Sequence, residues 1–145
     1  MNITYNHQIT VEHYNSLRQS VGWEVIEAGL AQTGLDNTAF LIVANDEDTP
    51  IGMTRVITDY GHQVLLADVI INPGYQRKGI GRELMKQAMA YIDESIAPGQ
   101  MKMINLMAAK GRESFYEQFG FITRPNEIRG AGMSQEIRKE VHNGL

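Results

Sequence analysis

The first half of the chain carries short apolar runs separated by polar turns, which is the pattern of β-strands joined by hairpins. Strands are predicted at residues 2–6, 38–44, 51–58 and 63–71. The last three are separated by short loops and are expected to pair as an antiparallel meander. Before them, apolar residues at helical spacing predict one helix from Thr10 to Gly22 and a second one that ends at Gly34.

The second half alternates between helices and strands. Ile80, Leu84, Ala88 and Ile92 recur every four residues, which predicts a long amphipathic helix over residues 80–96. A strand, a helix and a strand in succession imply a right-handed crossover and a parallel pairing. The remaining elements are predicted as strands at 101–107, 121–123 and 133–141 and a short helix at 111–119. We therefore expect an α/β fold, a mixed sheet of six to seven strands flanked by about four helices.

The turn before the long helix is rich in glycine and in cations. Gly79 and Gly81 put little bulk on the backbone, so consecutive N–H groups can point into one concavity at the helix N-terminus. The helix dipole contributes about half a positive charge there. A full positive charge is added by each of Arg77, Lys78 and Arg82. This combination favours a bound diphosphate over a single carboxylate, although a glycine-rich turn can also be purely structural.

Two common glycine motifs do not fit this turn. A P-loop requires Gly-Lys followed by Ser or Thr, whereas the order here is Lys78-Gly79-Ile80. A dinucleotide fingerprint requires a third glycine at the position of Leu84. The sequence therefore argues against both of these nucleotide-binding loops.

The hexapeptide at residues 76–81, QRKGIG, resembles the Q/R-x-x-G-x-G/A signature of the GNAT superfamily of N-acetyltransferases. Residues 68–76 are similar to the fourth strand of that family and to its approach to the loop. The FYEQFGF at residues 115–121 is similar to its later F-Y-E-x-x-G-F segment. The hexapeptide alone is a weak match, but two segments in the right order make the resemblance specific.

The resemblance implies a GNAT-like fold that binds acetyl-coenzyme A as a cosubstrate. The family's loop holds the pyrophosphate, and its fourth strand pairs with the pantetheine arm. Carried onto this sequence, the cofactor-binding residues are Ile70, Ile71, Gln76, Arg77, Lys78, Gly79, Ile80, Gly81, Arg82, Asn105 and Phe115. Family members often carry an Asn shortly before the fourth helix, where this chain reads AAKG at residues 108–111, and Asn105 is the candidate substitute.

Acetyl transfer to an amine also requires a proton acceptor, an oxyanion donor and a proton donor. Asp68 lies on the presumed fourth strand, and a carboxylate among apolar side chains takes up a proton more readily, which favours it as the base. The alternatives are a purely structural Asp68 and deprotonation through ordered water. The backbone N–H of Ile70 or Ile71 is the expected oxyanion donor. From the resemblance, Tyr116 is the acid for the departing thiolate; spacing alone predicts a packing aromatic.

Length and composition narrow the class of protein. The 145 residues fit one domain with its own core, over residues 1–145. The net charge of −4, without a dense basic tract, argues against nucleic acid as a partner. The chain contains no cysteine, which excludes disulfides and an acyl-cysteine intermediate. The N-terminus lacks a signal peptide and no run is long enough to span a membrane, so we expect a cytoplasmic protein.

The sequence therefore predicts an acetyl-CoA-dependent N-acetyltransferase that acts by direct transfer in a ternary complex, without a metal. The acceptor is a primary amine, either of a small molecule or of a peptide, and the acidic charge mildly favours a cationic one. The resemblance also suggests a possible homodimer. Two alternatives stay open: a non-catalytic acyl-CoA-binding sensor or regulatory module of the same fold, and a nucleotide-binding protein that uses the same loop.

Overall fold

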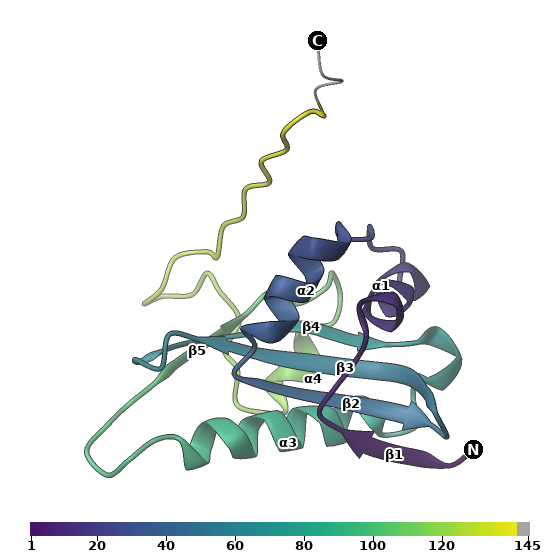
Figure 1. Cartoon of the computed structure of the whole chain (residues 1–145). Coiled ribbons are helices and arrows are strands. Elements are labelled where there is room, and N and C mark those ends of the chain that lie inside the picture. The colour runs from purple at the N-terminus through teal and green to yellow at the C-terminus, as the bar shows by residue number, and fades with distance from the viewer. Residues whose placement is uncertain (142–145) are drawn as a thin grey trace. The chain divides into compact units, whose positions relative to one another are not determined.

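The computed structural model describes residues 1–141, and the chain divides into two units, Met1–Leu106 and Met107–Leu145. The first unit is a five-stranded sheet with three α-helices (Figure 1). Its elements follow the chain as β1 (Ile3–Asn6), α1 (Val11–Ser20), α2 (Ala28–Asp36), β2 (Phe40–Asp46), β3 (Thr49–Thr58), β4 (Gln63–Ile71), a 3-10 turn (Pro73–Tyr75), α3 (Ile80–Glu94) and β5 (Met103–Leu106).

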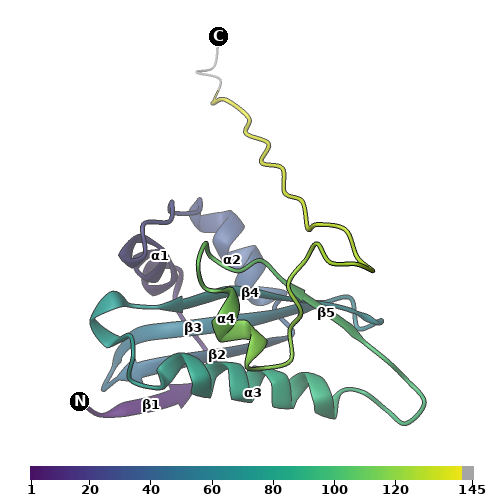
Figure 2. The ribbon, with the colours of Figure 1, turned by 180° about the vertical axis from the view of Figure 1, so that it is seen from behind.

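The sheet is mixed, as predicted. Its strands stand in the order β1-β2-β3-β4-β5, and the first four pair antiparallel. β4 and β5 are parallel because α3 carries the chain back along the sheet between them. The helices cover both faces: α1 and α2 lie over one face and α3 runs along the other (Figures 1 and 2).

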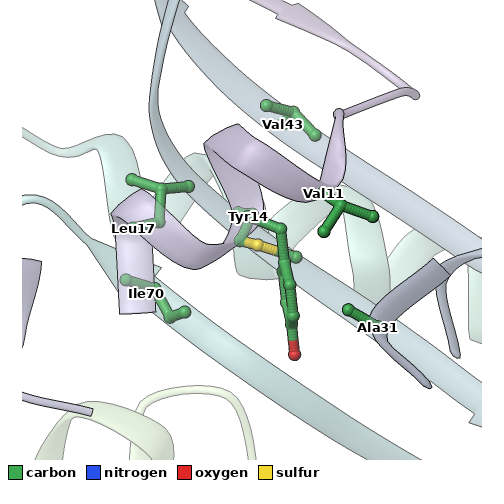
Figure 3. Close-up of a cluster of buried hydrophobic side chains, with 7 residues drawn as sticks. Val11, Tyr14, Leu17, Ala31, Val43 and Ile70 are labelled. Carbon is green, nitrogen blue, oxygen red and sulfur yellow. The ribbon is translucent and has the colours of Figure 1, made fainter. Parts of the chain in front are cut away.

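Each face of the sheet has its own apolar core, because side chains alternate between the two faces of a strand. Figure 3 shows the core under α1 and α2, in which helical residues pack on residues of β2, β3 and β4. Its buried members are Val11, Tyr14, Leu17, Ala31, Val43, Met53 and Ile70. The core under α3 contains Ile42, Ala44, Ile51, Ile80 and Leu84. The two cores fix β4 from both sides.

Local sequence accounts for the helix and hairpin boundaries. α1 begins where predicted, because the side chain of Thr10 accepts a hydrogen bond from the N–H of His13. α2 begins at Ala28, because the carboxylate of Glu27 caps its first N–H groups, and it ends at Asp36, two residues beyond the predicted end at Gly34. β2 has the predicted length but lies two residues later in the chain, and β3 begins two residues earlier than predicted. The two strands meet in a tight turn in which Glu47 adopts a left-handed φ of 54°.

The second unit begins at Met107 and contains one short helix, α4 (Glu113–Glu117), within its described residues. Aromatic rings pack against one another around this helix. Phe115 contacts Tyr116 and Phe119 with centroid separations of 5.1 and 5.4 Å, and Tyr116 lies 6.4 Å from Phe121. The prediction of a short aromatic helix is confirmed, with narrower bounds. The prediction of a single domain over the whole chain stays a prediction.

The prediction of six to seven strands is wrong: the sheet has five. Residues 121–123 and 133–141, predicted as the last two strands, form no strand in the part of the chain that the structure describes. Within residues 133–141, apolar side chains recur only at every fourth position, Met133, Ile137 and Val141, and all three are exposed. The inward positions between them are polar, so the segment lacks the continuous apolar stripe that holds a strand on a core.

Candidate functional site

A β-bulge interrupts β4. The register shifts between Met53 and Arg55 on β3, where the two β4 residues Asp68 and Val69 face the single residue Thr54. Asp68 has a φ of 53°, in the left-handed region that side chains with a Cβ rarely adopt. Such a backbone conformation costs about 1–3 kcal/mol and persists only where neighbouring groups hold it in place. The bulge is therefore a stable feature of this strand that neighbouring groups maintain.

Beyond the bulge, one edge of β4 is open. β5 pairs with residues 63–66 only, so within the described chain residues 67–71 have no strand partner on that side. The N–H of Asn72 donates to the carbonyl of Ile51 at 2.8 Å, and backbone groups alternate between the two edges of a strand. The backbone groups of Ile71 therefore point to the open edge, where its carbonyl accepts a hydrogen bond from Gln76 Nε2 at 3.0 Å.

The turn between β4 and α3 offers a run of backbone donors. Arg77 and Gly79 adopt left-handed φ values of 63° and 81°, and alternation of this kind brings successive N–H groups onto one side of the chain. The first helical hydrogen bond is donated by Glu83 to the carbonyl of Gly79 at 3.1 Å. Within residues 1–141, the N–H groups of residues 77–81 donate no hydrogen bond. Such a run of donors at the N-terminus of a 15-residue helix can bind an anion, and we call residues 77–81 the candidate anion-binding site.

Cations surround this anion-binding site. Arg77, Lys78 and Arg82 are all exposed. Arg77 and Lys78 form no ion pair in the part of the chain that the structure describes, so their charges face solvent. An anion with more than one negative charge is therefore better matched to this turn than a singly charged one.

The carboxylate of Asp68 is surrounded by donors. Its Oδ2 accepts hydrogen bonds from the Tyr14 hydroxyl at 2.8 Å and from Arg55 Nε at 2.8 Å. Its Oδ1 accepts one from the guanidinium of Arg18 at 3.2 Å. The side chain of Asp68 is 10% exposed, and those of Arg18 and Arg55 are 17% and 13% exposed. We call these four residues the Asp68 cluster.

An open strand edge that leads into an anion-binding helix N-terminus can hold an extended, phosphate-bearing ligand. A model of the acetyltransferase (GNAT) domain family matches residues 37–123, which include the bulge, the turn and α4. The chain belongs to the GNAT acetyltransferase family.

Relatives agree with this assignment. An uncharacterized N-acetyltransferase, ycf52, of Gracilaria tenuistipitata var. liui is 29% identical over 132 residues, which are 88% of this chain and 70% of that protein. A probable acetyltransferase from meticillin-resistant Staphylococcus aureus superposes with a TM-score of 0.84 at 28% identity, over 94% of this chain and all of the other. A GNAT-family acetyltransferase from Streptococcus pneumoniae TIGR4 has a TM-score of 0.73 at 28% identity, over 95% of this chain and 100% of its own.

In this GNAT chain, most of the predicted cofactor residues lie on one continuous path. Ile70 and Ile71 stand after the bulge, with side chains in the cores of opposite faces, and the residues from Gln76 to Arg82 follow through the turn into α3. Asn105 lies on β5 opposite Leu65, next to the point at which β5 stops pairing with β4. These residues belong to the first unit.

Tyr116 and Phe115 belong to α4 in the second unit. Tyr116 is 8% exposed, and burial raises the pKa of its phenol, an effect that the charge of Arg112 partly opposes. Its hydroxyl makes no hydrogen bond among the described residues, and no buried polar side-chain atom there lacks a partner. The ring is thus buried while the hydroxyl oxygen remains accessible, and the phenol stays protonated at neutral pH.

Sequence reasoning found Asp68 but missed the three residues that bind it. Tyr14 and Arg18 stand four residues apart on α1, and Arg55 interrupts the apolar strand β3 at a position that faces α1 and α2. A polar residue at an inward strand position is a signal that could have been used, because a buried charge requires a partner. The apolar surroundings expected for Asp68 are therefore replaced by two guanidinium groups and a phenol.

The described residues contain neither a cluster of metal-binding side chains nor a helix that could span a membrane. No group of three His, Asp or Glu side chains is placed to hold a metal ion there. None of the helices described is long and apolar enough to cross a membrane.

Proposed function

We propose that this GNAT protein transfers the acetyl group of acetyl-CoA to a primary amine by direct attack in a ternary complex. The proposal rests on the continuity between the open edge of β4 and the N–H groups of residues 77–81, which donate no hydrogen bond within residues 1–141. A strand edge can pair with the amide groups of a pantetheine arm, and a helix N-terminus binds a diphosphate.

The turn would hold the diphosphate of the cosubstrate. Backbone N–H groups from Arg77 to Gly81 donate to its oxygens, and Arg77, Lys78 and Arg82 supply opposite charge around them. This arrangement needs no metal ion, because the protein itself provides both donors and charge. The residues present therefore fit the cosubstrate that the family uses.

The open edge of β4 would hold the pantetheine arm and the thioester. The N–H of Ile71 points to this edge, whereas the backbone groups of Ile70 point to β3. Of the two donors expected from the sequence, Ile71 is therefore the better oxyanion donor. A donor of this kind is typically worth about 3 kcal/mol of transition-state stabilisation.

Tyr116 would donate a proton to the sulfur that leaves. The amine nitrogen gives up a proton to a base or to water and bonds to the acetyl carbon, the bond between carbon and sulfur breaks, and the phenol protonates the thiolate. The raised pKa of Tyr116 keeps the phenol protonated throughout the neutral range, so its donor role is expected to persist until the pH approaches that pKa. The phenolate is then reprotonated from solvent through the accessible hydroxyl.

The acceptor is proposed to be a primary amine of a small molecule or of a peptide. The net charge of −4 mildly favours one that carries additional positive charge. A cytoplasmic location and a homodimer stay predictions from the sequence.

Ligand binding is the first test. Thermal unfolding is measured with acetyl-CoA, ATP and NAD at equal concentrations, since a ligand stabilises only the protein that binds it. Acetyl-CoA at about 100 times its Kd is expected to add about 2.7 kcal/mol. Stabilisation by ATP or NAD but not by acetyl-CoA would refute the proposal.

Turnover is the second test. A panel of amines is screened for release of free thiol, and Tyr116→Phe is compared with Tyr60→Phe, which alters an exposed tyrosine in a turn. Tyr116→Phe is expected to bind acetyl-CoA normally and to lose about 10²- to 10⁴-fold in rate, while Tyr60→Phe keeps the parental rate. Binding of acetyl-CoA without thiol release from any amine would support the non-catalytic sensor instead.

A further inference from the structure

The four residues of the Asp68 cluster join three elements at the bulge. Tyr14 and Arg18 come from α1, Arg55 from β3 and Asp68 from β4. These partners are 54, 50 and 13 residues from Asp68 in the sequence. Figure 3 shows the hydroxyl of Tyr14 projecting beyond the apolar side chains around it, which leaves it free to donate to Asp68.

We propose that Asp68 is a positioning residue that holds the β4 bulge and the helices beside it, and that it is not the group that removes the proton from the acceptor amine. The inference rests on the proposed acetyl transfer and replaces the base that the sequence suggested. The contacts, the charges and the backbone around Asp68 each support it.

The lone pairs of Asp68 are largely occupied. Oδ2 accepts from both Tyr14 and Arg55, and Oδ1 accepts from Arg18, so three of about four lone-pair sites are used. Burial raises the pKa of the Tyr14 phenol, with the charge of Asp68 adding to the effect, so Tyr14 remains a donor at neutral pH. A base has to reach the proton that it abstracts. Here the side chain is 10% exposed and already engaged.

The charge balance points the same way. One carboxylate faces two guanidinium groups that are themselves largely buried, at 17% and 13% exposure. Uptake of a proton by Asp68 would leave Arg18 and Arg55 without their counter-charge, and buried ions that lose a partner are strongly destabilising. The charge balance of the Asp68 cluster therefore favours a structural role for the carboxylate.

The two arginines connect the bulge to the helices. Arg55 Nη1 donates to the carbonyl of Gly34 in α2 and to Thr38 Oγ1, both at 2.8 Å. Arg55 thus binds α2 and Thr38, in the short connection between α2 and β2, as well as Asp68. Removal of the carboxylate would release one anchor of α2 along with the bulge.

Arg18 makes an equivalent connection for α1 and the loop that follows it. Its Nε donates to the carbonyl of Glu24 at 2.7 Å, and its guanidinium lies 5.4 Å from the Trp23 ring centroid and 5.9 Å from that of Tyr14. The helical face that covers β4 is therefore tied to Asp68 through both arginines.

These bonds explain how a left-handed φ of 53° is maintained at Asp68. A strained residue is stable when its neighbours determine its position, and the carboxylate is held from α1 and β3 at once. The bulge in turn sets the direction of the strand at Ile71, whose N–H faces the open edge. Asp68 would therefore control catalysis through the backbone that holds the thioester, and the amine proton would leave to water.

The test is a double-mutant cycle with Asp68→Asn, Arg55→Gln and the double variant, with kcat/KM measured as a function of pH. We expect Asp68→Asn to lose about 10²-fold in kcat/KM, because a small displacement of the reacting groups typically has an effect of this size. The fall of kcat/KM at low pH, the acid limb of the profile, should occur at the same pH as in the parent. The double variant, which removes charge from both partners, is expected to recover about tenfold relative to Asp68→Asn. Loss of the acid limb in Asp68→Asn, or a double variant no better than that single variant, would overturn the proposal.

A milder variant tests the same inference if the charge variants fail to fold. Tyr14→Phe removes one hydrogen bond and keeps the three charges of the Asp68 cluster. If Asp68 only positions the strand, kcat/KM falls while the acid limb stays in place. If Asp68 is the base, loss of a donor to its carboxylate moves the acid limb to higher pH.

Urea unfolding of the same cycle separates this inference from the proposed function. The decrease in the urea midpoint of the double variant is expected to be smaller than the sum of the decreases in the two single variants, whatever reaction the protein catalyses. Glu136→Gln is the matched control, because it removes a carboxylate from an exposed ion pair with Arg138, at 73% and 61% exposure. Additive losses of stability would show that Asp68 and Arg55 do not interact and would refute the inference. Non-additive losses of stability in a protein that transfers no acetyl group would refute only the proposed function.

Discussion

Gly52 is the position at which a single methyl group tests the packing around β4. It lies on β3 opposite Ile71, directly beside the strand segment that leads from the bulge to the anion-binding turn. A Cβ at this position would lie 3.2 Å from the carbonyl oxygen of Ile70, 3.2 Å from Cδ1 of Ile71 and 3.4 Å from Cδ1 of Leu84. Optimal separations between carbon atoms are about 3.5–4.0 Å. Gly52→Ala therefore forces β4 or the α3 core to move.

The loss of stability depends on which neighbouring atoms can move away from the new methyl group. Leu84 is fully buried, with 0% exposure, and the Ile70 carbonyl is part of the backbone, so neither can yield freely. Extra volume in such a core typically costs about 1–3 kcal/mol. Replacement of glycine returns about 0.4–1 kcal/mol through the unfolded chain. We expect a net loss of about 1–2 kcal/mol, and about 4 °C of Tm for each kcal/mol in a chain of this size.

The assay is thermal and urea unfolding of Gly52→Ala beside Gly130→Ala. The control adds the same methyl group where no atom lies within 4 Å of the new Cβ. Gly130→Ala is expected to stay within about 0.5 kcal/mol of the parent. Because the methyl group presses on the backbone carbonyl of Ile70 and on the side chain of Ile71, Gly52→Ala should also weaken acetyl-CoA binding measured by calorimetry. An unchanged or higher Tm for Gly52→Ala would show that the contact between β3, β4 and α3 is not tight.

Three further predictions concern the turn and the Asp68 cluster. Gly79→Ala should lose about 1 kcal/mol, because alanine disfavours its left-handed φ of 81°, while Gly79→Asn loses less; urea unfolding compares them, and equal stability of all three proteins would contradict the role of φ. The raised pKa of Tyr14 gives stability that is present below its ordinary value of 10.0 and is lost as pH rises through the raised pKa, so in alkaline urea titrations Tyr14→Phe should lose less stability with pH than the parent. Neutralising Arg77 and Lys78 to Gln should weaken acetyl-CoA binding at low salt and flatten its salt dependence, and an unchanged salt slope by calorimetry would exclude both side chains from the phosphate site.

The turn between β4 and α3 and the start of α3 could be located from sequence because their determinants are local, whereas anion binding there stays a prediction. Gly79 supplies a left-handed residue at the N-terminus of α3, and the period of four from Ile80 predicts the buried face of that helix. Hydrogen-bond donors at a helix N-terminus need no distant residue, since they follow from helix geometry itself. The antiparallel meander was predictable for the same reason, because short turns join its strands.

The C-terminal strands could not be judged from local pattern. Residues 133–141 carry apolar side chains and no strong breaker, and the sequence therefore suggested a strand. A strand exists only where another backbone pairs with it, and pairing is a property of the tertiary structure. Within its described residues the second unit provides none for this segment.

Asp68 shows most clearly the difference between what the sequence predicts and what the fold determines. Its sequence neighbours Ala67 and Val69 are apolar, and from them an apolar environment and a proton-accepting role were expected. Its spatial neighbours Tyr14, Arg18 and Arg55 are polar or charged, and the fold brings them from 13 to 54 residues away. The sequence alone determined the family, the turn and the position of the carboxylate, because each depends on residues close together in the chain. Only the tertiary structure decided what surrounds that carboxylate, because the packing of α1 on the sheet sets the charges around it.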